Sequence, residues 1–258
     1  MTWPTTVDAL RSWLVGWPDP PWLMSGQTVT VWFEPPADLS QRLLGADFAS
    51  TARPRRPARL RFYDVSFTGS SADSWQRDSS AGRFREAVFA LPAEVKGIEG
   101  EVSTHMWTDD DTYLQWGREV FGWPLQRGEI TLKGPLWSDG GNRGAADVKT
   151  VAGTASIEVA GPDDSPTSSQ AASRGPWLTP RRVLATGSLG HGALEITAVE
   201  PLVVRPGERE LVHATAGLSF TSGHPLHGLK IAPLRAEIHR GFELLVGSSV
   251  SVVTSWVM

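Results

Sequence analysis

Glu86 is the acidic residue whose place in the sequence points most clearly to chemistry. It lies in FREAVFAL, residues 84–91, where the alternation of apolar and polar residues is typical of a β-strand. In such a strand Phe84, Glu86 and Val88 share one face. If that face is turned to the protein interior, desolvation raises the pKa of the Glu86 carboxyl, which can then transfer protons near neutral pH. The alternative is a structural ion pair with a nearby arginine, namely Arg83, Arg85 or Arg118.

Histidine offers a second route to proton transfer, because its ordinary pKa lies close to neutral pH. His105 precedes Met106 and Trp107 in a strand-like segment and is a candidate proton carrier in a pocket. His224 and His227 have a spacing that metal ligands use, but no cysteine or acidic partner completes a ligand set in the GHPLHG turn. There is no glycine-rich phosphate loop and no G-x-S-x-G motif, so nucleotide chemistry and serine hydrolysis gain no support. We therefore expect no metal and no other cofactor.

A helix with a defined start and end precedes a third candidate position. In TDDDTYLQWGREVFGWP, residues 108–124, the aspartates can cap the helix and place negative charge in its first turn, and the final Gly-Trp-Pro ends it. Gly117 falls on the apolar face, where the missing side chain allows close packing against a sheet. The helix end therefore delivers Leu125 and Gln126 from a rigid platform.

Much of the remaining chain alternates in the manner of β-strands. The runs that do so are residues 28–33, 58–67, 84–91, 100–107, 128–137, 150–160, 193–204 and 210–220. Because Gly, Pro or Asp turns separate most of them, they predict a mainly antiparallel sheet that closes or folds over itself. We also expect a short helix over Thr6–Val15 and surface loops over Ser138–Ala146 and Gly161–Pro176. With no repeat and no linker between independent halves, residues 1–258 are expected to form a single domain.

The overall composition narrows the classes of function. The chain has no cysteine, which excludes disulfides, thiolate nucleophiles and cysteine-ligated metals. A net charge of -4 argues against nucleic acid as a partner, and no apolar run approaches the roughly 20 residues of a membrane span. The N-terminus lacks the pattern of a secretory signal, so we expect a cytoplasmic protein. The twelve tryptophans offer large apolar surfaces of the kind that line ligand pockets, although for any one of them a place in the core is commoner.

Four segments together resemble one known family. They are the Phe-Arg-Glu of residues 84–86, MWTDDDTYLQWGREVFGWP at 106–124, HPLHGLKIAPLRAEI at 224–238 and PPWLMSG at 20–26. In this order they are similar to the acetoacetate decarboxylase-like superfamily, and GREVFGWP is the most specific part. The resemblance implies a mainly β (α+β) fold, with a curved antiparallel sheet or barrel around a buried apolar pocket and a few helices outside. It also implies that the protein can form a homo-oligomer.

The covalent catalyst of that family is missing from its place. Members that have it carry a lysine directly after the proline that corresponds to Pro124, and its amine forms an iminium with a substrate ketone. Here Leu125 and Gln126 stand where the decarboxylases have a lysine pair, and neither side chain can form a Schiff base. Lys96 and Lys133 are expected at the surface, the usual location of a lone lysine. The sequence therefore argues against Schiff-base chemistry.

The acids of the family are matched in part. Glu86 falls where the family places an active-site glutamate, and Tyr63 lies near the position of a second one, with Asp64 on the opposite face of the same strand. An arginine that the decarboxylases use in the early strand has no counterpart in residues 25–27. This departure counts against recognition of an acetoacetate-type carboxylate.

These observations lead to a hypothesis about function. We expect a non-Schiff-base enzyme of secondary metabolism, a cyclase, isomerase or dehydratase that uses shape and general acid/base catalysis on an apolar, polyketide-type small molecule. Glu86 and Tyr63 are its expected catalytic residues. The expected substrate-binding residues are Leu125, Gln126, Trp107, Trp116, Trp123, His105 and Arg118. Two alternatives stay open, a decarboxylase or aldolase-dehydratase with a relocated lysine, and a noncatalytic protein that binds an apolar small molecule.

Overall fold

A computed structural model describes most of the chain. The described residues are 22–44, 57–69, 82–95, 97–118, 122–163, 177–184, 192–199, 202–246 and 250–257. The helix expected over Thr6–Val15 lies outside these ranges, as does most of the loop expected over Gly161–Pro176. None of the helices in the described ranges is long and apolar enough to cross a membrane.

Fourteen strands form one continuous sheet within the described residues. They are β1 (Trp22–Phe33), β2 (Ala58–Gly69), β3 (Arg83–Val95), β4 (Ile98–Thr108), β5 (Leu125–Arg127), β6 (Glu129–Lys133), β7 (Gly144–Thr150), β8 (Gly153–Pro162), β9 (Trp177–Leu184), β10 (Gly192–Val199), β11 (Leu202–Arg205), β12 (Glu208–Phe220), β13 (Pro233–Val246) and β14 (Val250–Val257). Their order across the sheet is β14-β10-β9-β4-β3-β2-β1-β13-β12-β8-β7-β6, with β11 beside β13 and β5 beside β4. The described helices are short, namely α2 (Leu39–Leu44), α3 (Asp111–Trp116) and α4 (Pro135–Ser138). The mainly β fold expected from the sequence is confirmed.

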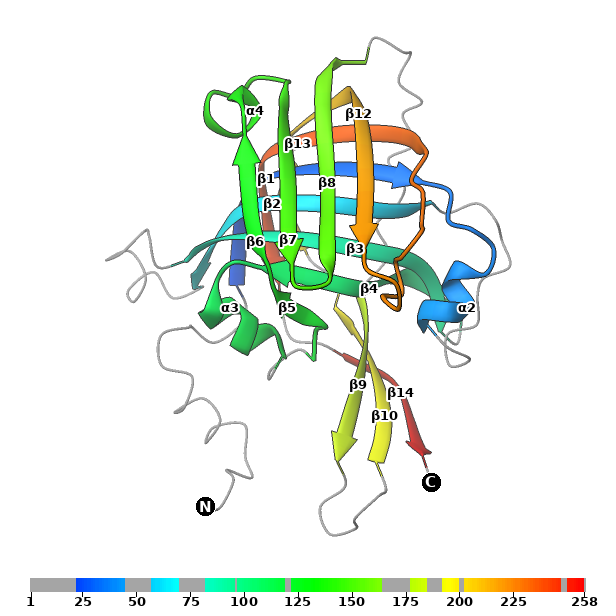
Figure 1. Ribbon diagram of the computed structural model, residues 1–258. Coiled ribbons are helices and arrows are strands. Elements are labelled where there is room, and N and C mark those ends of the chain that lie inside the picture. The colour runs from blue at the N-terminus through cyan, green and yellow to red at the C-terminus, as the bar shows by residue number, and fades with distance from the viewer. Residues whose placement is uncertain are drawn as a thin grey trace.

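The sheet curls until its two halves face one another. In Figure 1, β6, β7, β8 and β12 cross in front of β13, β1, β2, β3 and β4, while β9, β10 and β14 extend away from this body. Because β3 comes into contact with β6, the curled part is a nearly closed barrel. Its interior holds the largest apolar core, which includes Phe33, Phe62, Phe89, Trp107 and Ile157.

A second apolar cluster, the outer cluster, lies on the other face of the same strands. It combines side chains of β2, β3 and β4 with Tyr113 from α3, Trp123 and Leu125. Alternation along β3 separates the two cores, since Phe84 and Val88 belong to the outer cluster and Ala87 and Phe89 to the barrel interior. The faces predicted for this strand are therefore confirmed.

The structure corrects several predicted boundaries. The strand expected over residues 128–137 ends at Lys133, because Gly134 has a positive φ of 90° and Pro135 then opens the short helix α4. The loop expected over Ser138–Ala146 runs into β7, and the run expected over residues 193–204 is split into β10 and β11. Strands β5, β9, β13 and β14, and all but the last residue of β7, lie outside the predicted runs, and β4 pairs in parallel with β5 and with β9.

Candidate active site

Strand pairing aligns the predicted catalytic residues in one row on the outer face of the sheet. Tyr63 in β2 lies directly opposite Glu86 in β3, so their side chains point to the same side. The next row on this face begins with Arg61 and continues through Val88 and Met106 to Leu125, which joins it because β5 pairs in parallel with β4. The residues predicted at Glu86, Tyr63 and Leu125 are thus brought together by the fold.

Glu86 is a buried acid held by one hydrogen bond. Its side chain is 5% exposed, and the hydroxyl of Tyr113 donates to its Oε1 at 3.1 Å. Burial raises the pKa of Glu86 to about 8, although the hydrogen bond from Tyr113 and the charge of Arg61 act in the opposite direction. The carboxyl is therefore mostly protonated at neutral pH and can both give and take a proton there.

The alternative of a structural ion pair does not describe Glu86. Arg83 pairs with Asp64 and Arg85 pairs with Asp109, while Arg118 is exposed. Desolvation, as expected from the alternation of β3, is the main influence on this carboxyl.

Tyr113 reaches Glu86 because α3 is fixed at its first turn. The carboxylate of Asp110 caps the helix by accepting a hydrogen bond of 2.6 Å from the backbone amide of Tyr113. The ring of Phe84 stacks on the Tyr113 ring with centroids 3.9 Å apart. Burial raises the pKa of Tyr113, as does the neighbouring Glu86, so its hydroxyl stays neutral and donates. Tyr113 was not among the site residues predicted from the sequence.

Arg61 brings a buried cation to the same place. Its Nε donates to Thr30 Oγ1 at 2.8 Å and its Nη1 donates to the Tyr63 hydroxyl at 2.6 Å. Its buried Nη2 has no hydrogen-bond partner among the described residues. Since an unsatisfied buried donor is costly, an oxygen of a bound ligand is the natural partner for Nη2. Arg59, on the same face, forms an ion pair with Glu101.

The arginines were missed in the sequence although a signal was present. In ARLRFYD, residues 58–64, Arg59 and Arg61 have the same parity as Tyr63, so a strand must place all three on one face. Two arginines on the face of a predicted catalytic residue are unusual in a buried strand.

These side chains enclose a small chamber. Its volume is about 30 Å³, and its lining is Met24, Arg59, Arg61, Tyr63, Glu86, Val88, Glu101, Ser103, Met106, Tyr113, Trp123 and Trp177. Such a space holds about two water molecules. The chamber therefore combines an acid, two tyrosines and a partly unpaired guanidinium with apolar walls.

Leu125 stands at the position of the family's lysine, and its side chain adds apolar surface behind the wall of this chamber. It is fully buried in the outer cluster, together with Tyr63, Met106 and Trp123. Gly117 makes the close packing possible, because a Cβ at that position would lie 2.0 Å from Leu125 Cδ1. The lysines that the structure describes, Lys133, Lys149 and Lys230, are all exposed.

Among the tryptophans that were predicted to bind substrate and whose side chains are described, only Trp123 lines the chamber. Trp107 is fully buried in the barrel interior, where it stacks on Phe220 and on His105. The expected place of Trp107 and His105 in the pocket is corrected, because Met106 takes the chamber side of β4 and its neighbours must face the other way. Burial lowers the pKa of His105 to about 4, so this histidine is a neutral core residue at pH 7.

The same alternation removes Gln126 from the chamber, since it follows Leu125 in β5 and is exposed. Arg118 is exposed as well, and the Trp116 side chain lies outside the described part of the structure. No group of three or more His, Asp or Glu side chains in the described ranges is arranged to hold a metal ion.

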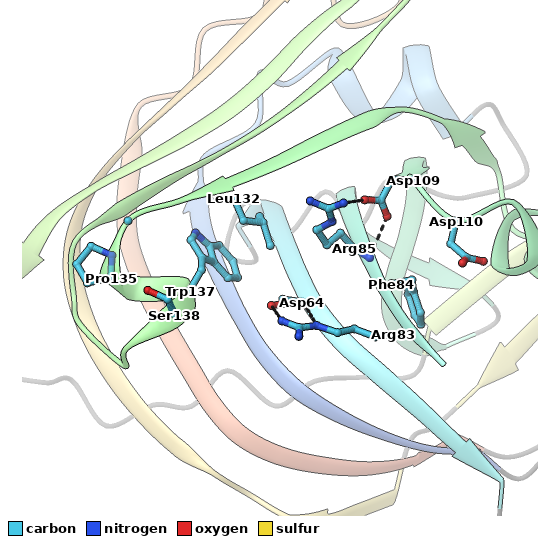
Figure 2. Close-up of a pocket in the computed structure, with 11 residues that line it drawn as sticks. Asp64, Arg83, Phe84, Arg85, Asp109, Asp110, Leu132, Pro135, Trp137 and Ser138 are labelled. Atoms are coloured by element: carbon cyan, nitrogen blue, oxygen red, sulfur yellow. Dashed lines mark hydrogen bonds and ion pairs between the residues drawn. The ribbon is translucent and has the colours of Figure 1, made fainter. Parts of the chain in front are cut away.

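An open cleft of about 1040 Å³ lies near the chamber but receives the other face of β3. It is lined by Asp64, Arg83, Phe84, Arg85, Asp109, Asp110, Leu132, Gly134, Pro135, Trp137 and Ser138. Figure 2 shows its two walls, with Leu132, Pro135 and Trp137 on one side and the Arg83–Asp64 and Arg85–Asp109 pairs on the other. Phe84 belongs both to this lining and to the outer cluster.

Comparison with known proteins gives a consistent picture. The family model described as acetoacetate decarboxylase (ADC) matches residues 6–242. An acetoacetate decarboxylase-like enzyme from Sphingomonas wittichii RW1 aligns with a TM-score of 0.73 and 14% identity, over 94% of this chain and 96% of that one. Acetoacetate decarboxylase from Legionella pneumophila subsp. pneumophila str. Philadelphia 1 aligns with a TM-score of 0.67 and 17% identity, over 93% of this chain and 90% of that one.

A third similar structure is the enduracididine biosynthesis enzyme MppR complexed with pyruvate. It aligns with a TM-score of 0.67 and 18% identity, over 91% of each chain. At these identities the structures show a shared fold. None of the curated proteins matches this chain.

Proposed function

The chain belongs to the acetoacetate decarboxylase family, and we propose that it is a member that works by general acid/base catalysis without a lysine nucleophile. Its proposed activity is that of a cyclase, isomerase or dehydratase in secondary metabolism. The proposed substrate is an apolar, polyketide-type molecule that carries a carbonyl group. Glu86 moves the proton, and Arg61 with Tyr63 holds the carbonyl oxygen.

The state of Glu86 is the observation that carries this proposal. A carboxyl with a pKa of about 8 is roughly 10% ionised at pH 7, so it supplies both the base and the acid form. It lies in a small chamber of buried side chains beside a tyrosine hydroxyl and a guanidinium. Cyclisation, isomerisation and dehydration next to a carbonyl each need a proton removed from carbon and a proton returned, and one such group can serve both steps.

Arg61 and Tyr63 provide the electrostatic half of the reaction. When a proton leaves the carbon next to a carbonyl, negative charge develops on the carbonyl oxygen. The Nη2 of Arg61 points its protons to no described partner, and the hydrogen bond from Nη1 polarises the Tyr63 hydroxyl. A preorganised cation in a buried site stabilises such an enolate oxygen more strongly than water does.

The lining and the size of the chamber support an apolar substrate that enters by moving side chains. Val88, Met106, Trp123 and Trp177 supply apolar surface. A volume of about 30 Å³ is far below the roughly 300 Å³ or more of ordinary ligand pockets, so binding requires the chamber to widen. Trp123 and Trp177 meet edge to face with centroids 6.3 Å apart, and reorienting these rings would open space without disturbing the strands that hold Glu86.

Similar structures also support a carbonyl compound as substrate. MppR has been captured with pyruvate and with the condensation product of pyruvate and imidazole 4-carboxaldehyde. These are small carbonyl compounds or are made from them. The chemistry proposed here keeps that substrate class and replaces covalent activation by proton transfer.

Exchange of carbon-bound hydrogen for deuterium tests the proposal without knowledge of the natural substrate. Phenylacetone and pyruvate are incubated with the protein in D2O, and exchange next to the carbonyl is followed by NMR. We expect exchange of at least one probe to be accelerated, to rise with pH up to about 8, and to fall at least about 100-fold in Glu86→Gln. Glu94→Gln serves as the matched control, because it makes the same change in the same strand outside the chamber lining, and its rate should stay close to that of the wild type.

Two further outcomes separate the alternatives. Borohydride trapping followed by intact-mass measurement should leave the protein mass unchanged, and a ketone adduct would identify a lysine enzyme instead. Binding of the probes without exchange would identify a noncatalytic binding protein. Exchange that is equally fast in Glu86→Gln would remove Glu86 from the mechanism.

A further inference from the structure

The first three residues of β3, namely Arg83, Phe84 and Arg85, all line the cleft, and Glu86 after them lines the chamber. Glu86 turns to the chamber, whereas Arg83 and Arg85 turn to the cleft on the opposite face. Each of these arginines is paired with a carboxylate, Arg83 with Asp64 and Arg85 with Asp109, at distances of 2.7 and 2.5 Å. The proposed function uses neither pair.

In both pairs the arginine is the member that faces solvent. The side chains of Arg83 and Arg85 are 65% and 45% exposed, whereas those of Asp64 and Asp109 are 7% and 16% exposed. The carboxylates thus lie beneath the guanidinium groups and hold them in place. A molecule that enters the cleft meets the cations first.

The guanidinium groups keep hydrogen-bond donors for such a molecule. Arg83 uses Nε and Nη2 on the two oxygens of Asp64, which leaves Nη1 to point elsewhere. Arg85 contacts Asp109 through Nη2. Because a guanidinium has five N–H donors arranged in a plane, a carboxylate or phosphate can bind the remaining edge of an arginine that is already paired.

The opposite wall of the cleft suits an apolar group. Leu132, Pro135 and Trp137 form it, as Figure 2 shows. The Trp137 indole is fixed by a hydrogen bond of 3.0 Å from Nε1 to the carbonyl of Ala145. A fixed aromatic surface loses little conformational entropy when a ligand packs on it. The volume of about 1040 Å³ is at the upper end of the range for small-molecule sites.

We propose that this cleft is a second ligand-binding site, for an organic anion that has an apolar or aromatic body. The carboxylate or phosphate of the ligand binds Arg83 and Arg85, and its body packs on Trp137 and Leu132. The site is separate from the chamber, because the two lie on opposite faces of β3.

The acidic residues in the lining weaken the binding of an anion. The lining holds three carboxylates against two arginines. Both oxygens of Asp64 accept from Arg83, both oxygens of Asp109 accept from Arg85, and Asp110 accepts from the amide of Tyr113. Asp64 and Asp109 thus direct both of their oxygens to the arginines, and the three carboxylates together lower the affinity of the cleft for an anion. Binding should therefore be moderate in strength and should weaken with added salt.

Four probes with one body and different head groups test the proposal. Isothermal titration calorimetry compares 4-phenylbutyrate, 4-phenylbutyl phosphate, 4-phenylbutylamine and 4-phenylbutanol on the full chain. We expect at least one of the two anions to bind, and the amine and the alcohol to bind at least about tenfold more weakly. Comparison of the carboxylate with the phosphate shows which head group the arginines prefer. Equal binding of the alcohol or the amine would overturn the proposal.

Variants locate the binding. The double variant Arg83→Gln/Arg85→Gln should lose at least about tenfold in affinity for the anion, with far-UV circular dichroism confirming that it is folded. Arg42→Gln is the matched control, because Arg42 is also exposed and also paired with an aspartate, Asp38, but does not line the cleft. The Glu86→Gln variant should bind the anion as tightly as the wild type does. The outcome of the binding test is therefore independent of the proposed catalysis. Undiminished binding in the double variant would place the anion elsewhere and refute the proposal.

Discussion

The chamber and the cleft lie on opposite faces of β3 and treat charge in opposite ways. In the cleft, water reaches the arginines, and each of the two arginines has a carboxylate partner. In the chamber, Glu86 has no cationic partner in hydrogen-bond contact among the described residues and holds its proton to a pKa of about 8. Two neighbouring positions of one strand thus carry a mostly protonated carboxyl on one side and a paired charge on the other, and exposure to solvent makes the difference.

The chamber as a whole is left with an excess of positive charge. Arg59 and Glu101 neutralise each other, Glu86 is mostly neutral at pH 7, and Arg61 stays charged. That imbalance is tolerable because Thr30 and Tyr63 accept hydrogen bonds from Arg61. In the proposed reaction this excess would stabilise negative charge that develops on a substrate, whereas each arginine of the cleft already has a carboxylate partner.

The largest effect that separates the two regions should appear in the pH dependence of stability. The folded pKa of Glu86, about 8, is raised above its ordinary value of 4.5, so its contribution to stability is fully present below pH 4.5 and is lost as pH rises through about 8. We expect the free energy of unfolding to decline over this window by an amount on the order of a few kcal/mol. Urea denaturation at pH 5, 7 and 9 measures it.

Glu86→Gln should flatten that decline, because the amide cannot ionise. Arg85→Gln in the cleft serves as the control and should keep the slope of the wild type. A decline of the same size in the Glu86→Gln variant would mean that another group titrates, and the contrast between the regions would then not rest on Glu86.

Ion pairs provide the next largest contrast. Arg59→Met leaves Glu101, which is 19% exposed, without its partner in the chamber, and we expect a loss of about 3 kcal/mol. Arg85→Met breaks a pair whose arginine is 45% exposed, and we expect a loss below about 1 kcal/mol. Chemical denaturation of both variants at pH 7 tests the difference. Similar losses for the two would show that burial does not distinguish these pairs.

The sequence predicted the outer face of the sheet well where alternation is regular. The strand around Glu86, the opposite facing of Tyr63 and Asp64, and the aspartate-capped start of the helix before Leu125 are all confirmed by the structure, although α3 is described only as far as Trp116. Each depends on contacts between near neighbours in the chain, which sequence patterns describe directly.

The sequence-based predictions failed where pairing between strands that are far apart in the chain decides the structure. Strand β13 contains Glu237 and His239 buried between β1 and β12, and their polarity conceals the strand from a search for apolar alternation. Trp107 was placed in the pocket on residue type and Gln126 on its position in the family pattern, but their parity relative to Met106 and Leu125 puts them on the other face. Applying one rule of alternation to every strand, not to β3 alone, would have excluded both residues and included Arg61.

A smaller effect is expected where α3 packs on the chamber wall. The Cβ of Gly117→Ala would lie 2.0 Å from Leu125 Cδ1 and 3.2 Å from Trp123, so the wall must shift. We expect a loss of about 1–2 kcal/mol, measured by urea denaturation, because overpacking a filled core is destabilising. Gly217→Ala is the control, since its new Cβ would lie 3.2 Å from the Ser156 hydroxyl and contact no apolar wall. Shortening Leu125 in the double variant Gly117→Ala/Leu125→Ala should recover part of the interaction, and strict additivity would argue against this contact.

The smallest effect is expected from Leu125→Lys, which should not give the protein any decarboxylase activity. Burial in the outer cluster would lower the pKa of the new amine and make it nucleophilic, so the amine itself would be competent. The chamber departs from the pattern of the decarboxylases, because Tyr63 stands near the position of a second acid and residues 25–27 hold no arginine. Release of CO2 from acetoacetate should therefore stay at the uncatalysed rate, with Leu125→Met as the control for size and circular dichroism as the check on folding. If the lysine variant alone releases CO2 and is trapped by borohydride, the chamber lacks only an amine to act as a decarboxylase. That outcome would contradict the proposal that Glu86 serves a different, non-covalent reaction.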